Sequence, residues 1–209
     1  MKITKFVHSC LLVEDGDYTA IIDPGMYSWE SGLFAIETLT RLDDIIITHQ
    51  HADHMYMPFI EELVEKFPLA RITTNPAVAD LLHEAGVKSG TLSQGKVQLF
   101  EAAHETVEAL WPTPANIGVH LADTLTHPGD SHHIDATKRV LALPITAPWG
   151  SMIDAANLGV RLKPEFIIPI HDWHWNDMAR TRAYEDLARF FAGHSIHFVQ
   201  AQSGIPFEV

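Results

Sequence analysis

The sequence predicts an α/β protein built from two mixed β-sheets that pack face to face, with helices outside them. Antiparallel strand patterns dominate the first part of the chain, and strand and helix patterns alternate in the rest. The sequence shows no internal repeat, low-complexity stretch or Ser/Gly-rich linker. The chain has 209 residues, a length that fits one domain, so we expect a single domain over residues 1–209.

Short strands are expected in the first part of the chain. The turn residues Asp15-Gly16-Asp17 indicate a hairpin between two of them. Asp44–Thr48 is short and largely apolar, which is typical of a strand buried on both faces. The other elements expected here are strands at Ile3–Val7, Leu11–Glu14 and Tyr18–Ile22, and a short helix at Ile36–Leu42.

Helices and strands alternate from Met57 onwards. Met57–Phe67 is a predicted helix because its apolar residues recur at helical spacing. Asn75-Pro76 is typical of a helix start, and Gly86 of the end of that helix. Further helices are predicted at Ser151–Leu162 and Ala179–Phe191. Further strands are predicted at Arg71–Thr74, Lys96–Glu101, Val107–Trp111, Gly118–Leu121, Arg139–Pro144, Phe166–Ile170 and His197–Gln200.

The composition argues against several classes of protein. Lys and Arg total 14 and Asp and Glu total 27, and a net charge of −13 disfavours binding to nucleic-acid phosphates. No apolar run reaches the roughly 20 residues that span a bilayer. The N-terminus lacks a signal-peptide pattern, and Cys10 is the single cysteine. We therefore expect a cytoplasmic protein with no membrane or nucleic-acid partner.

The chain has 14 histidines, and three of them lie within one segment, Thr48–His54. Residues i and i+2 of an extended segment point the same way, so His49 and His51 can converge on one point. Asp53 and His54 follow at a turn and can face a second point close by. Three imidazoles and a carboxylate are costly to cluster beside a buried strand without a compensating cation. The segment therefore predicts a metal site.

The pattern His-x-His-x-Asp-His after a buried strand resembles the metal-binding motif of the metallo-β-lactamase-fold superfamily. That family is a four-layer αββα sandwich of two mixed sheets flanked by helices, with one or two metals at one edge, and the resemblance implies this fold here. It extends over nearly the whole chain, in the expected order. The other motifs of the family are matched at Asp23, His104, Asp130 and His171.

The resemblance implies two metal sites that share a bridging carboxylate. The first metal would be bound by His49, His51 and His104, and the second by Asp53, His54 and His171. Asp130 would bridge the two metals together with a water or hydroxide. Asp23 would support the ligands by accepting the second N–H of an imidazole.

Two divalent cations roughly 3.5–4 Å apart would lower the pKa of a bridging water and polarise an attacked carbonyl or phosphoryl oxygen. The expected catalytic residues are Asp53, Asp130 and His174, the last as a carrier of a proton to the leaving group. Imidazole and carboxylate ligands suit several divalent metals. We place zinc ahead of manganese and iron.

The layout around His8-Ser9-Cys10 and the segment Leu143–Met152 resemble the small branch of the superfamily that includes the L-ascorbate-6-phosphate lactonase. In that branch the first histidine lies near the metals, so His8 is a candidate active-site residue, or else it caps a hairpin. Other side chains near the motifs could line a pocket for a small-molecule substrate, or pack in the core or between subunits of a homo-oligomer. They are Trp29, on the loop after Asp23, and His132, Trp149 and Trp173.

The sequence thus predicts a metal-dependent hydrolase that attacks a small ester, lactone or phosphoester. Three other functions stay open. They are a mononuclear iron oxidoreductase or dioxygenase on the same fold, a nuclease and a non-catalytic metal-binding protein. A nuclease would need a basic track, and the sequence has no basic cluster beyond Lys138-Arg139.

Overall fold

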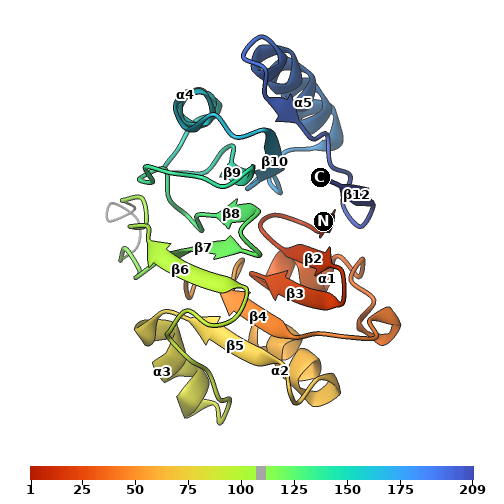
Figure 1. The fold of residues 1–209 in the computed structure, drawn as a ribbon, viewed down its shortest axis with the longest axis vertical. Helices are drawn as coiled ribbons and strands as arrows, with labels where there is room; N and C mark the ends of the chain where they lie inside the picture. Colours follow the sequence, from red (N-terminus) through yellow and green to blue (C-terminus); the bar gives the residue numbers. More distant parts are fainter. Residues whose placement is uncertain (107–111) are drawn as a thin grey trace. The chain divides into compact units, whose positions relative to one another are not determined.

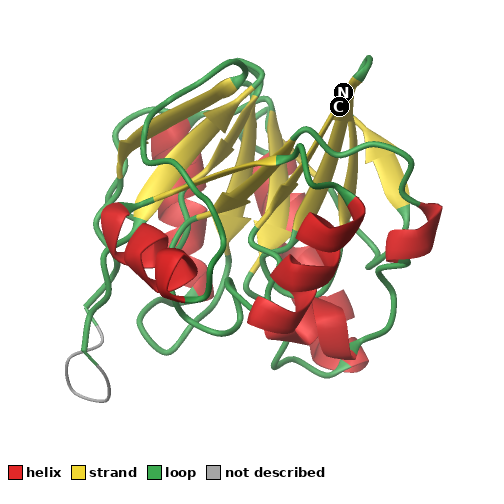
Figure 2. Ribbon diagram, turned by 90° about the horizontal axis from the view of Figure 1, so that it is seen from below, coloured by secondary structure: helices red, strands yellow, loops and turns green. Residues whose placement is uncertain are grey.

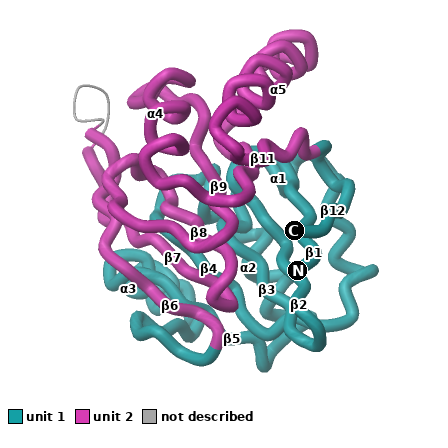
Figure 3. The backbone as a smooth tube through the Cα atoms, turned by 45° about the horizontal axis from the view of Figure 1, so that its top comes forward, with its two compact units in different colours: residues 1–95, 202–209 teal, residues 96–201 magenta. Residues whose placement is uncertain are grey.

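The computed structural model describes residues 1–106 and 112–209, so the predicted strand Val107–Trp111 lies outside the described residues. The described chain forms two compact units (Figure 3). Unit 1 comprises residues 1–95 and 202–209, and unit 2 comprises residues 96–201. Each unit has its own mixed sheet of six described strands and its own hydrophobic core. The predicted class, a mixed α/β protein with two mixed sheets and helices, is confirmed.

The sheet of unit 1 has the strand order β12-β1-β2-β3-β4-β5 (Figure 1). The pairs from β12 to β3 are antiparallel, and β4 and β5 continue the sheet in parallel. The hairpin predicted at Asp15-Gly16-Asp17 joins β2 to β3. The strands are β1 (Lys2–Lys5), β2 (Leu11–Asp15), β3 (Tyr18–Ile22), β4 (Asp44–Ile47), β5 (Arg71–Thr74) and β12 (Pro206–Glu208).

The helices of unit 1 pack on its sheet through one apolar cluster. Ile45 of β4 and Ile72 of β5 are buried in this cluster together with Phe59 and Leu63 of the longest helix, α2. Figure 2 shows helices, in red, lying beside strands, in yellow. The helical elements are α1 (Met26–Glu30), the 3₁₀ turn η1 (Ile36–Thr38), α2 (Met57–Lys66) and α3 (Pro76–Glu84).

The sheet of unit 2 has the order β11-β10-β9-β8-β7-β6. The pairs from β11 to β8 are parallel, and β7 and β6 are antiparallel. The strands are β6 (Val97–Glu101), β7 (Ile117–Leu121), β8 (Leu125–His127), β9 (Val140–Pro144), β10 (Phe166–Ile170) and β11 (His197–Phe198).

Two helices, α4 (Met152–Leu162) and α5 (Asp177–Ala192), follow β9 and β10. Ser151 and Asp154 form a capping box at the start of α4, which satisfies backbone N–H groups that the first helical turn leaves unpaired. Leu158 of α4 and Phe191 of α5 are buried in one cluster with Leu141 and Ile167 of the sheet. The crossovers through α4 and α5 therefore account for the parallel pairing of β9, β10 and β11.

Several predicted elements differ from the structure. Trp29 lies in the short helix α1 and not on a loop, because only Asp23–Gly25 separates β3 from that helix. The helix expected at Ile36–Leu42 is a single 3₁₀ turn. The strands β8 and β12 were not predicted, because each is three residues long and too short to show a period in the sequence.

Candidate functional site

The segment after β4 brings the first group of metal-type side chains together in unit 1. His49 is completely buried, and its Nε2 lies 3.1 Å from Nδ1 of His51. The two rings therefore converge, as the i, i+2 spacing predicts. Two imidazole nitrogens at this distance need a proton or a cation between them.

Asp23 fixes the orientation of His54. Its Oδ2 lies 2.7 Å from Nδ1 of His54, and its carboxylate also accepts hydrogen bonds from the backbone N–H and the hydroxyl of Thr48. Because the carboxylate accepts from all three groups, Nδ1 of His54 carries a proton, and the ring is neutral when Nε2 carries none. The lone pair of this ring is then on Nε2, where Ser9 Oγ lies 3.3 Å away.

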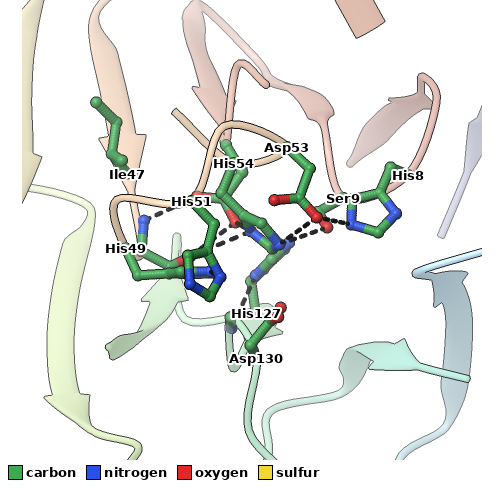
Figure 4. Close-up of polar contacts among 12 residues, drawn as sticks. His8, Ser9, Ile47, His49, His51, Asp53, His54, His127 and Asp130 are labelled. Carbon is green, nitrogen blue, oxygen red and sulfur yellow. Dashed lines mark hydrogen bonds and ion pairs between the residues drawn. The ribbon is translucent and has the colours of Figure 1, made fainter. Parts of the chain in front are cut away.

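His8 and Asp53 flank that nitrogen. His8 Nε2 lies 2.9 Å from Asp53 Oδ2, which is 4.0 Å from Nε2 of His54. One ligand atom from each of the three residues lies within 4.8 Å of the others. Figure 4 shows the three side chains pointing toward one another. His8 thus lies beside two of the candidate ligands, and its place in the site stays a prediction.

The backbone holds these residues in unusual conformations. His8 and Asp23 have φ values of 66° and 50°, in the left-handed region that residues other than glycine rarely adopt. Such strain persists where the surrounding contacts enforce it, and it clusters at functional sites. At Gly25, a Cβ atom would lie 1.7 Å from the backbone oxygen of Asp53. Only glycine therefore allows the loop after β3 to contact the turn that carries Asp53.

Unit 2 assembles a second group from the ends of three strands. His104 follows β6, Asp130 follows β8, and His171 follows β10. Asp130 lies between the two imidazoles: its Oδ1 is 2.6 Å from Nε2 of His171, and its Oδ2 is 3.5 Å from Nε2 of His104. His171 also has a left-handed backbone, with φ of 65°. Within unit 2, the carboxylate of Asp130 therefore lies beside both imidazoles.

The tautomer of His104 is fixed by a backbone carbonyl. Its Nδ1 lies 2.6 Å from the carbonyl oxygen of Glu105, so Nδ1 is the donor and a neutral ring presents the lone pair of Nε2 toward Asp130. Asn116 supports the same region, because its Nδ2 donates to the carbonyl oxygens of Ala102 and Pro128.

Asp172, the residue after His171, anchors the loop that carries His171 to α5. Asp172 is buried and accepts a 2.7 Å hydrogen bond from the hydroxyl of Tyr184. Its Oδ2 also lies 3.1 Å from Nε of Arg180. Burial and the carboxylate of Asp172 raise the pKa of Tyr184, so this hydroxyl stays a donor throughout the neutral range.

The expected pocket residues have different surroundings. Trp149 donates from Nε1 to Oδ2 of Asp130 at 3.2 Å and contacts the rings of His132 and His171. His132 donates to the carbonyl oxygen of Pro144. Trp29 instead packs beside Phe59 in the apolar cluster of unit 1, which agrees with the alternative prediction that it packs in the core.

Trp173 and His174 lie on the loop after β10. Trp173 is exposed, and its ring contacts that of His174 edge-on. Nε2 of His174 lies 3.5 Å from Oγ1 of Thr146. Burial lowers the pKa of His174, and the neighbouring His171 lowers it further. The ring therefore holds its proton less firmly than a solvated histidine does.

Four residues that contact the candidate ligands or their loops were not predicted from the sequence. Ser9 and Thr48 stand beside candidate ligands in the sequence, and that adjacency is the signal that could have found them. Glu105 follows His104 and offers the same signal. Tyr184 offers none, because its contact with Asp172 depends on how α5 packs.

The donor types of these side chains fit a borderline divalent cation. They combine imidazole nitrogens with carboxylate oxygens, ligands that zinc, manganese and iron share. In each unit a carboxylate oxygen and an imidazole nitrogen lie within 3 Å, a spacing that requires a proton or a cation between them. Cys10 takes no part, since burial raises the pKa of its thiol and keeps it protonated.

Comparison with known proteins agrees with these features. Residues 2–171 match the family model of the beta-lactamase superfamily domain. Protein Rv0786c of Mycobacterium tuberculosis is 32% identical over 182 residues, which cover 82% of this chain and 84% of that protein. The UPF0173 metal-dependent hydrolase MJ1163 of Methanocaldococcus jannaschii is 26% identical over 187 residues, 81% of this chain and 83% of that protein.

Solved structures show the same fold. The metallo-beta-lactamase fold protein YhfI from Bacillus subtilis matches with a TM-score of 0.68 at 17% identity, over 99% of this chain and 98% of that one. At this identity the likeness concerns the fold alone. Among the described residues, no helix is long and apolar enough to cross a membrane.

Proposed function

The chain belongs to the beta-lactamase superfamily, and from this premise we propose that it is a metal-dependent hydrolase. The observation that carries the proposal is the fixed tautomer of His54. Its Nδ1 proton is held by the buried Asp23, and its Nε2 atom faces Asp53 and His8. A buried imidazole oriented by a carboxylate is the arrangement that metal-binding histidines require.

The proposed ligands follow the order of the family motifs along the chain. One metal is assigned to His49, His51 and His104, and the other to Asp53, His54 and His171. Asp130 is assigned to both metals. Three dedicated protein ligands per metal leave coordination positions for water and substrate, which a catalytic site needs and a structural site lacks.

When bound, a pair of divalent cations would supply a nucleophilic hydroxide and polarise the oxygen of the attacked bond. The chain's own residues would hold the ligand atoms in place: Asp23 orients His54, and Trp149 orients Asp130 through its indole N–H. We propose His174 as the group that moves a proton to the leaving group. Zinc ranks ahead of manganese and iron as the resident metal.

A small ester, lactone or phosphoester is the proposed substrate. The motif order supports the reaction class, and the net charge of −13 favours a small molecule over a nucleic acid. Trp149 and the exposed Trp173 are proposed as an apolar wall for that substrate.

The direct test is an assay of metal-loaded protein on a panel of esters, lactones and phosphodiesters. We expect activity with at least one class, and a loss of at least about 100-fold in His51→Ala and Asp53→Ala. His83→Ala is the matched control, because His83 is an exposed histidine on α3 and its removal should leave activity unchanged. Intact activity in His51→Ala and Asp53→Ala would exclude this site.

Metal analysis of protein purified without chelator separates the alternatives. Zinc or manganese together with hydrolysis supports the proposal. Iron together with oxygen consumption on a thiol substrate would instead indicate an oxidoreductase. Bound metal without activity on the whole panel would indicate a non-catalytic metal-binding protein.

A further inference from the structure

Glu105 connects the segment that carries His104 to the segment that carries Asp130. Its backbone carbonyl accepts the Nδ1 proton of His104 at 2.6 Å. Its backbone N–H donates to the carbonyl oxygen of Asp130 at 2.9 Å. Its side-chain Oε1 accepts the backbone N–H of His132 at 2.8 Å. One residue therefore contacts the first candidate ligand directly and the turn of the second at two points.

The two contacts to the turn lie on either side of Ser131. The backbone contact holds Asp130 at one end of the turn, and the side-chain contact holds His132 at the other. Two hydrogen bonds to residues i and i+2 restrict both the position and the tilt of the peptide segment between them. Without the side-chain contact, Glu105 would hold the turn only through its bond to the Asp130 carbonyl, and the backbone N–H of His132 would lose its acceptor.

Glu105 also pairs with His133, but this contact is less important. Oε2 of Glu105 lies 3.1 Å from Nε2 of His133, whose side chain is 68% exposed, against 15% for that of Glu105. Ion pairs on an exposed side chain contribute little, because water screens them. The hydrogen bond that Oε1 accepts from the His132 backbone is the shielded one.

We propose that Glu105 is a positioning residue that keeps His104 and Asp130 in the relative positions that metal binding needs. The inference rests on the proposed function, because it takes both residues as ligands. The Oε1 oxygen of Glu105, and not its negative charge, makes the hydrogen bond that positions the turn. A glutamine at this position retains the oxygen, whereas an alanine removes it.

The experiment compares Glu105→Ala, Glu105→Gln and His133→Ala with the wild type, all as the full chain. Two measurements are made. Backbone amide exchange at His132, followed by NMR in metal-free protein, reports the hydrogen bond itself. Calorimetric titration with Zn²⁺ reports metal affinity.

We expect fast exchange at His132 in Glu105→Ala and slow exchange in the other three proteins. We expect Zn²⁺ affinity to fall about 10–100-fold in Glu105→Ala, the usual cost of losing a residue that orients a ligand. Glu105→Gln and His133→Ala should bind Zn²⁺ like the wild type. Wild-type Zn²⁺ affinity in Glu105→Gln distinguishes loss of the hydrogen bond from loss of the charge. Amide exchange in the metal-free protein distinguishes loss of this one hydrogen bond from unfolding of the chain.

Wild-type affinity in Glu105→Ala would overturn the inference. So would a loss in Glu105→Gln or His133→Ala equal to that in Glu105→Ala, because the charge pair would then carry the effect. If the wild type binds no Zn²⁺, manganese or iron, the proposed function itself fails, and the role of Glu105 fails with it. If the wild type binds metal and Glu105→Ala binds it equally well, only the role of Glu105 is excluded and the proposed function stands.

Discussion

Nδ1 of His54 lies 2.7 Å from Oδ2 of Asp23, and both side chains are completely buried. Asp23 also accepts two hydrogen bonds from Thr48, the residue that ends the buried strand and begins the histidine segment. One carboxylate thus links the end of β3, the end of β4 and a candidate metal ligand. It can act on the metal site without touching a metal.

Asp23→Asn is expected to weaken Zn²⁺ binding about 10–100-fold, because the amide offers only one acceptor oxygen for three donors. Asparagine tolerates the left-handed backbone of this position, so the variant isolates the hydrogen bonds from backbone strain. Calorimetric titration checks the affinity. Asp17→Asn, on the exposed hairpin turn, is the control for the loss of a carboxylate and should bind like the wild type.

Gly25→Ala is expected to destabilise the protein by more than about 2 kcal/mol. The Cβ of the alanine would overlap the backbone oxygen of Asp53, so the loop after β3 and the turn at Asp53 would both have to move. The shift would displace Asp53 and lower metal affinity as well. Urea unfolding and Zn²⁺ titration measure the two effects. In Gly90→Ala the new Cβ meets its nearest atom at 3.9 Å, an ordinary contact, so a loss of that size there would contradict the steric explanation.

Trp149→Phe is expected to retain the ring contacts with His132 and His171 and to remove only the N–H that reaches Asp130. The freed carboxylate would lose its fixed orientation, since a hydrogen bond to a charged group contributes about 1.5–3 kcal/mol. Zn²⁺ affinity should fall by about tenfold or more, and calorimetric titration measures the loss. Unchanged affinity would limit Trp149 to a role in the substrate pocket.

Tyr184→Phe is expected to lower the free energy of unfolding by about 1.5–3 kcal/mol, because it removes a hydrogen bond to a buried carboxylate. The anchor of the His171 loop would loosen at the same time. A double-mutant cycle with Asp172→Asn measures the coupling between the two groups. Strictly additive effects of the two substitutions would show that the hydrogen bond does not hold this loop.

The sequence predicts the strands of four or five residues better than the three-residue strands. Tyr18–Ile22, Arg71–Thr74 and Phe166–Ile170 have the predicted bounds, because each is an apolar or β-branched run enclosed by turn residues. β12, at an end of its sheet, and the three-residue β8 have too few residues to show a period. Their existence depends on pairing with partners that a local pattern cannot reveal.

The candidate site was predictable where its residues are adjacent in the sequence. His49 and His51 converge because strand geometry alone dictates it. The contacts of Glu105 with the turn at Asp130 join positions 25 or more residues apart, and they depend on how β6 and β8 are placed in the sheet. The assignment of ligands to two metals stays a prediction from the family motifs.

β12 pairs with β1 at one end of the unit 1 sheet, yet the two strands come from opposite ends of the sequence. During synthesis on the ribosome, residues 96–201 emerge and can complete the unit 2 sheet while β1 still lacks this neighbour. A nascent chain halted before Pro206 would thus display the open backbone of β1 as a template for aggregation.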